Sequence, residues 1–137
     1  MLTKIDIQTN KGESLVNITA QVRAAVKDSG VQEGLCVLYV PHTTGGLVIN
    51  SGMDPNTAKD VIEEIHRLVP TRADFHHIFD TPADASGHIK AVLVGGSQAL
   101  IVTGGNVLLG SSQSIFFFEF DGPRNRQVIV RIMKDQE

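Results

Sequence analysis

The chain is poor in sulfur and in large aromatic side chains, with one cysteine, one tyrosine and no tryptophan in 137 residues. A single cysteine cannot form an internal disulfide, which is consistent with a reducing compartment. Cys36 lies in the apolar run 35–40, and such a setting is typical of a small buried hydrophobe rather than of a catalytic thiolate. The scarcity of Tyr and Trp argues against an extended platform on which nucleic-acid bases could stack.

A run of basic residues and a long apolar segment are missing as well. The net charge is −3, so the overall electrostatic field disfavours nucleic-acid binding. No stretch approaches the roughly 18 consecutive apolar residues of a membrane-spanning helix. The first residues, 1–6, also lack the apolar character of a signal segment. We therefore expect a soluble, cytoplasmic protein with no nucleic-acid partner and no membrane partner.

What is present is enough for one folded core. Hydrophobic residues make up 42% of the sequence and charged residues 20%, a balance that argues against disorder. The length is typical of one domain, and no internal repeat or linker divides it. We expect a single domain over residues 1–137.

The spacing of apolar residues predicts about three helices. The first follows Asn17 as its N-cap and ends at Gly30. The second starts with Asp54 as N-cap and Pro55 as first helical residue, and it ends before Pro70. Its expected buried stripe consists of Val61, Ile62, Ile65, Leu68 and Val69.

A third, short helix is expected over residues 88–94, with Asp84 or Ser86 as its cap. The polar segment before it, about 71–83, is long for a loop in a small domain, and such loops tend to carry function.

The remaining periodicity predicts strands. They are expected at 3–9, 14–16, 35–40, 47–49, 99–103, 106–109 and 114–120, with a last strand carrying Val128, Val130 and Ile132. Gly104-Gly105 suits a hairpin turn, because glycine accepts positive φ. Strands paired through hairpins, with helices between them, favour an α+β fold with a mainly antiparallel sheet.

Three histidines have small or hydroxylated neighbours that leave room for a ligand. His42 precedes Thr43-Thr44, His88 follows Ser86-Gly87, and His77 lies in the polar segment. Imidazole suits both proton transfer near neutral pH and metal binding. Three histidines from separate segments would suit a zinc ion with one open position, although no compact metal motif is present. From the residues alone, each histidine could equally have a structural role.

Other polar groups offer anion contacts or an unusual carboxylate. Helix starts near Asp54 and His88 would present free backbone N–H groups to an anion, and Arg124 and Arg126 lie in a turn from which they could reach a phosphate. Glu119 interrupts a Phe-rich strand, where alternation places it on the face of Phe117. Such a carboxylate is either paired or functional, and burial would raise its pKa.

Taken together, these motifs resemble the YjbQ-type family, known as secondary thiamine-phosphate synthases, over about residues 2–132. The pieces that carry the resemblance are His42-Thr43-Thr44, Ile49-Asn50, Asp54-Pro55, Asp60, His77, His88-Ile89-Lys90, Ser97-x-x-Leu100, Gly110-Ser111-x-Gln113 and Glu119-Phe120. Ser112 stands where the family usually has tryptophan, and Gly87 where it usually has alanine.

The resemblance implies a trimer-forming α+β domain with a site between subunits. It implies an activity that joins hydroxymethylpyrimidine diphosphate to thiazole phosphate, with a physiological reaction on some other phosphorylated small molecule. His88, His42 and Glu119 would be catalytic, and His42, His77 and His88 would hold a divalent metal, zinc before others. The expected substrate or anion contacts are Thr43, Thr44, Asn50, Asp84, Ser97, Ser111, Gln113 and Arg126.

Two other functions stay open at this point. One is a metal-dependent hydrolase of a phosphate or other ester. The other is a non-catalytic trimeric protein that binds a metal or a phosphorylated metabolite.

Overall fold

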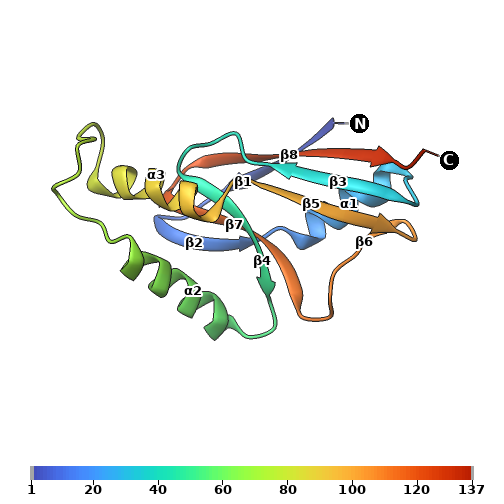
Figure 1. Cartoon of the computed structure of the whole chain (residues 1–137), viewed down its shortest axis with the longest axis horizontal. Coiled ribbons are helices and arrows are strands. Elements are labelled where there is room, and N and C mark those ends of the chain that lie inside the picture. The colour runs from blue at the N-terminus through green and yellow to red at the C-terminus, as the bar shows by residue number, and fades with distance from the viewer. Residues whose placement is uncertain (1, 137) are drawn as a thin grey trace.

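Two antiparallel β-sheets form the centre of the protein in a computed structural model that describes residues 2–136 (Figure 1). A five-stranded sheet has the order β1-β8-β3-β5-β6, and a three-stranded sheet has the order β2-β7-β4. The strands are β1 (Leu2–Gln8), β2 (Gly12–Asn17), β3 (Gly34–Tyr39), β4 (Gly45–Ser51), β5 (Ser97–Thr103), β6 (Asn106–Val107), β7 (Gln113–Gly122) and β8 (Asn125–Lys134). With the helices α1 (Thr19–Ser29), α2 (Pro55–Leu68) and α3 (Pro82–Val94), the expected α+β class is confirmed.

The hydrophobic core lies between the two sheets and α1. The five-stranded sheet contributes alternate residues such as Leu38, Val102 and Val130, the three-stranded sheet contributes Leu47 and Phe117, and α1 contributes its buried stripe. Cys36 is fully buried among them, and burial raises the pKa of its thiol to about 11. The cysteine is therefore a protonated core residue at neutral pH.

Local signals in the sequence explain several element ends. The N-cap of α1 is Ile18 rather than the predicted Asn17. Asn17 still contributes at the start of the helix, because its Oδ1 accepts hydrogen bonds from the backbone N–H and the hydroxyl of Thr19. Gly30 ends that helix in the left-handed conformation, with φ of 73°. Gly104 and Gly105, at φ of 59° and 75°, form the turn between β5 and β6 as expected.

Helix α2 starts as predicted but is not buried as predicted. Asp54 accepts a hydrogen bond from the Asn56 N–H, and Pro55 is the first helical residue. No residue of α2 is fully buried, and Leu68 of the predicted stripe is 64% exposed. The apolar periodicity identified one face of the helix correctly, but it could not reveal that this face packs mainly beside the edge strand β2 and stays partly exposed.

A buried ion pair attaches α2 and α3 to β2. The Lys90 ammonium on α3 is fully buried and donates to Glu13 Oε1 on β2, and His66 Nδ1 on α2 lies 2.9 Å from the same oxygen. One carboxylate thus joins three elements, which positions α3 for the site described below.

Helix α3 is almost twice as long as predicted. It begins at Pro82 rather than His88, and its N-cap is Thr81, whose Oγ1 accepts from the Asp84 N–H. Gly87 lies inside this helix where α3 packs closely on the three-stranded sheet: a Cβ there would lie 3.3 Å from Thr44 Cγ2 and 3.4 Å from Phe120 Cβ. His88 consequently lies inside a helix and has no free backbone N–H to offer an anion.

Within residues 2–136, no helix has both the length and the apolar character needed to cross a membrane.

Candidate functional site

One open pocket collects most of the predicted site residues. It has a volume of about 400 Å³ and forms where the loop after β3, the segment before α3, α3 itself and the start of β8 meet. We call it the histidine pocket. Its lining residues are Pro41, His42, Thr43, Thr44, His77, Asp80, Asp84, His88, Arg124 and Arg126.

Three metal-ligand atoms converge in the histidine pocket. His77 Nε2 lies 2.7 Å and His88 Nε2 lies 3.1 Å from Asp84 Oδ2. The donor atoms of these three residues all lie within 4.8 Å of one another. Asp84 and His88 are four residues apart on α3, so they share one helix face, and His77 reaches them from the preceding segment.

A second contact orients the His88 ring. Its Nδ1 lies 3.2 Å from the carbonyl oxygen of Thr43. Since a carbonyl can only accept, Nδ1 carries a proton and donates it. In a neutral His88 ring the other nitrogen, Nε2, then carries a lone pair that points at the Asp84 carboxylate. Two electron-rich atoms repel each other, so a second proton or a cation has to lie between Nε2 and Asp84 Oδ2.

The Asp84 carboxylate is ionised at neutral pH. Its side chain is only 7% exposed, and burial alone would raise its pKa. The hydrogen bond from His77 and the charge and hydrogen bond of His88 outweigh burial and hold the pKa of Asp84 below its usual value. A buried carboxylate between two imidazoles attracts positive charge, which a proton on either ring or a bound cation could supply.

His42 lines the same pocket but does not join the three converging atoms. Its Nε2 accepts a hydrogen bond of 2.9 Å from the backbone N–H of Gln127. Burial lowers the pKa of His42, and the Arg126 guanidinium lowers it further. The ring is therefore neutral, and since Nε2 accepts, Nδ1 carries the proton. The three histidines predicted to bind a metal all line this pocket. The three atoms that converge, however, belong to His77, Asp84 and His88, and His42 is not among them.

Glu119 lies behind the pocket rather than in its lining. It is fully buried between the sheets and accepts hydrogen bonds from Thr9 Oγ1, Arg126 Nε and Nη2, and the Asp121 N–H. Burial tends to raise its pKa, but these donors outweigh it and the pKa is lowered, opposite to our expectation from burial alone. Glu119 holds Arg126 in place, and Arg126 in turn donates to Thr44.

The other predicted contacts lie elsewhere on the chain. Asn50 and Gln113 lie where β4 and β7 are paired through Ser51↔Gln113, whereas the pocket is next to the opposite end of the same pair, at Gly45↔Glu119. Gln113 Oε1 accepts from the Gly110 N–H and closes the turn that contains Ser111. Ser97 begins β5 and is exposed. Within one chain, these four residues do not reach the histidine pocket.

Three pocket residues were outside the predicted set, namely Pro41, Asp80 and Arg124. Asp80 has a φ of 59°, a left-handed conformation that aspartate tolerates better than most side chains. Arg124 was considered only as a phosphate contact in a turn. Its Nη2 donates to Asp121 Oδ2 at 2.8 Å and lies 3.8 Å from Asp84 Oδ1. No local pattern around Asp80 marks it, because its position depends on the path of the segment before α3.

Comparisons with known proteins agree over nearly the whole length. The family model described as "UPF0047 protein YjbQ-like" matches residues 3–135. A UPF0047 protein of Methanocaldococcus jannaschii is 45% identical over 99% of this chain and 96% of its own length. The UPF0047 protein YugU of Bacillus subtilis is 35% identical over 97% and 99%.

Solved structures show the same fold. A YjbQ/UPF0047 protein of Clostridium acetobutylicum has a TM-score of 0.90 and 37% identity, covering 96% of this chain and 99% of that one. A protein of unknown function from Sulfolobus solfataricus has a TM-score of 0.92 and 29% identity, with coverage of 98% and 97%. This chain belongs to the YjbQ/UPF0047 family.

Proposed function

We propose that the histidine pocket is the active site of a metal-assisted enzyme that acts on a phosphorylated small molecule. The joining of hydroxymethylpyrimidine diphosphate to thiazole phosphate is its side activity. The observation that carries the proposal is the convergence of His77 Nε2, Asp84 Oδ2 and His88 Nε2 in a pocket that also contains two arginines. Metal ligands and guanidinium groups together suit a diphosphate.

The donor set fits a divalent metal such as zinc. Two imidazoles and one carboxylate with an open fourth position are typical of catalytic zinc. Tetrahedral bonds of about 2.0–2.1 Å place ligand atoms about 3.3–3.4 Å apart. The three donor atoms lie within 4.8 Å of one another, and Asp84 Oδ2, at 2.7 and 3.1 Å from the two imidazole nitrogens, would have to move a few tenths of an ångström away from them to hold the ion. When bound there, the ion supplies Lewis-acid stabilisation of phosphate oxygens.

Residues of the chain itself stabilise the diphosphate leaving group. In the joining reaction the thiazole nitrogen bonds to the methylene carbon while the carbon–oxygen bond to diphosphate breaks, and the diphosphate keeps the electron pair. Negative charge therefore develops on the leaving group, and donors placed around it lower the barrier. Arg124, 44% exposed at its side chain, is placed to bind that charge, and the neutral His42 offers its Nδ1–H.

A turnover assay tests the proposal. Purified protein with zinc, hydroxymethylpyrimidine diphosphate and thiazole phosphate should form thiamine phosphate. His88→Ala should lower the rate at least about 100-fold, because it removes one of three ligands, and the loss of a residue that only orients a metal ligand already costs about 10–100-fold. His76→Ala is a matched control, since that imidazole is exposed and is absent from the pocket lining.

The possible results separate the candidate functions. Undiminished turnover in His88→Ala removes that residue from the mechanism. Release of inorganic phosphate from simple esters, without joining, would favour a hydrolase. Tight retention of diphosphate with no product from any substrate would favour a binding protein.

We also propose that the chain assembles as a homotrimer. The outer face of the five-stranded sheet exposes large apolar residues, namely Leu35, Tyr39, Ile101 and Met133, which is an arrangement typical of subunit interfaces. A neighbouring subunit also offers a way to bring Asn50, Ser111 and Gln113 to a histidine pocket that they cannot reach within one chain. Light scattering should give three times the 14.8 kDa chain mass, and Ile101→Asp should lower it. A monomeric wild-type mass contradicts the trimer.

A further inference from the structure

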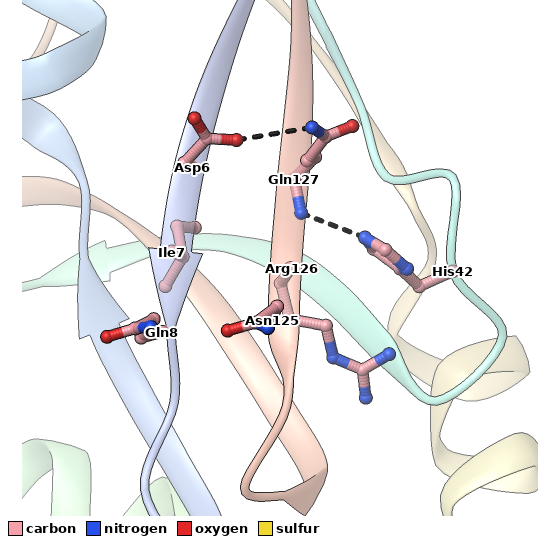
Figure 2. A pocket seen from close by; sticks show the side chains of 7 residues that line it. All are labelled: Asp6, Ile7, Gln8, His42, Asn125, Arg126 and Gln127. Atoms are coloured by element: carbon pink, nitrogen blue, oxygen red, sulfur yellow. Dashed lines mark hydrogen bonds between the residues drawn. The ribbon is translucent and has the colours of Figure 1, made fainter.

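A second cavity is lined by His42 together with residues of β1 and β8. It has a volume of about 520 Å³, and Figure 2 shows the side chains that line it. Asp6 and Gln8 on β1 are paired with Gln127 and Asn125 on β8, as Asp6↔Gln127 and Gln8↔Asn125. Alternation places these four polar side chains on one face of the sheet. We call this cavity the amide groove.

The amide groove and the histidine pocket share two walls. His42 and Arg126 line both cavities. With volumes of about 520 and 400 Å³, each is in the range of small-ligand sites. A ligand with two chemically different ends can therefore occupy both and pass beside His42.

Charge distinguishes the two cavities. Arg126 already has its charge compensated by Glu119, and the amide groove adds only the Asp6 carboxylate, which repels an anion. The histidine pocket contains two carboxylates, Asp80 and Asp84, but it adds the half-exposed Arg124 and the three converging atoms that would hold a divalent cation. A phosphate therefore belongs in the histidine pocket, and an uncharged group in the amide groove.

The carboxamides of the amide groove indicate which kind of uncharged group it can bind. Gln127 Nε2 donates to Asp6 Oδ1 at 3.2 Å, which orients that amide, and Gln8 and Asn125 are exposed next to it. A carboxamide offers one acceptor oxygen and two N–H donors. Such a lining matches a flat ring that carries both donors and acceptors, for example an amino group beside a ring nitrogen.

We propose that the amide groove binds the uncharged, hydrogen-bonding head of a ligand whose phosphate lies in the histidine pocket. Gln8 and Asn125 contact that head, and His42 donates its Nδ1–H where the head joins the phosphate. This inference rests on the proposed function, because it takes the histidine pocket as the phosphate site.

Calorimetric binding of two probes to the purified protein tests the proposal. The probes are inorganic diphosphate, which has no head group, and hydroxymethylpyrimidine diphosphate, which has one. Wild type should bind the second probe more tightly. Gln8→Ala/Asn125→Ala should weaken its binding about 10-fold or more, as expected for two lost hydrogen bonds, and should leave the Kd of inorganic diphosphate within about 2-fold. Gln21→Ala, an exposed amide on α1, is the matched control.

The outcomes distinguish this inference from the proposed function. Equal affinity of wild type for both probes, or unchanged affinity in the double variant, overturns the role of the amide groove and leaves the phosphate site intact. Equal weakening of both probes also overturns it, because the groove would then not be selective for the head. Absence of binding of either probe to wild type overturns the proposed function and this inference with it.

Discussion

Replacing Glu119 with alanine should lower the free energy of unfolding by about 3–5 kcal/mol, the usual cost of removing one partner from a buried ion pair. Glu119 is fully buried and Arg126 is 5% exposed. The substitution leaves the guanidinium without its counter-charge, and it removes the acceptor of Thr9 Oγ1 and of the Asp121 N–H. Urea denaturation followed by circular dichroism at neutral pH measures the loss.

Two comparisons make this prediction specific. Glu119→Ala/Arg126→Met removes both charges and should cost less than the single substitution, since no unpaired buried charge remains. Glu64→Ala breaks an ion pair whose side chains are 58% and 77% exposed and should cost less than about 1 kcal/mol. A Glu119→Ala variant as stable as Glu64→Ala would contradict the assigned role.

The same pair gives stability a defined pH dependence. The pKa of Glu119 is lower in the folded protein than its usual value, so its contribution is complete above the unfolded carboxyl pKa of about 4.3. It is lost as the pH falls through the lower folded value. The difference in stability between wild type and Glu119→Ala should therefore shrink below about pH 4.

Short sequence patterns predicted most of the fold, because strand faces, helix starts and tight turns are set by residues close together in the sequence. Alternation in Ser114–Phe120 placed Glu119 on the same face as Phe117, and the structure buries that face and pairs Glu119 with Arg126. Asp54-Pro55 marked the start of α2, and Gly104-Gly105 marked a hairpin.

The sequence did not predict how far α2 is buried or where α3 begins, because both depend on how the helices pack. The apolar stripe of α2 predicts an amphipathic helix but does not say how much of it is covered. The start of α3 was predicted too late because Asp84 or Ser86 was taken as its cap, although Thr81-Pro82 is itself an N-cap followed by a favourable first residue. Glycine usually weakens a helix, but at position 87 the absence of a side chain lets α3 lie close to Thr44 and Phe120.

The sequence identified most residues of the site but not how their side chains are placed relative to one another. Once α3 is extended to Pro82, Asp84 and His88 share a helix face, and a sequence search for that spacing would have paired them. The approach of His77 depends on the path of the segment before α3. The role of His42 depends on the Gln127 N–H of β8, which is 85 residues away in the sequence.

The largest functional effect should come from Asp84, the residue common to both imidazole contacts. Asp84→Ala should weaken zinc binding at least about 100-fold, because it removes one of three ligands and the only negative charge among them. Competition with a chromophoric chelator measures the affinity directly, without relying on turnover. His77 and His88 are each 40% exposed, so the loss of their partner should leave the fold intact, and circular dichroism checks this.

Asp80→Asn is the matched control for this test, since Asp80 lines the same pocket and is not one of the three converging ligands. Asparagine tolerates the left-handed backbone of that position, so the substitution changes charge without straining the loop. We expect zinc affinity within a few-fold of wild type for Asp80→Asn and a large loss for Asp84→Ala. Similar losses in both variants would mean that the pocket attracts cations only through its overall charge, and unchanged affinity in Asp84→Ala would remove the metal site altogether.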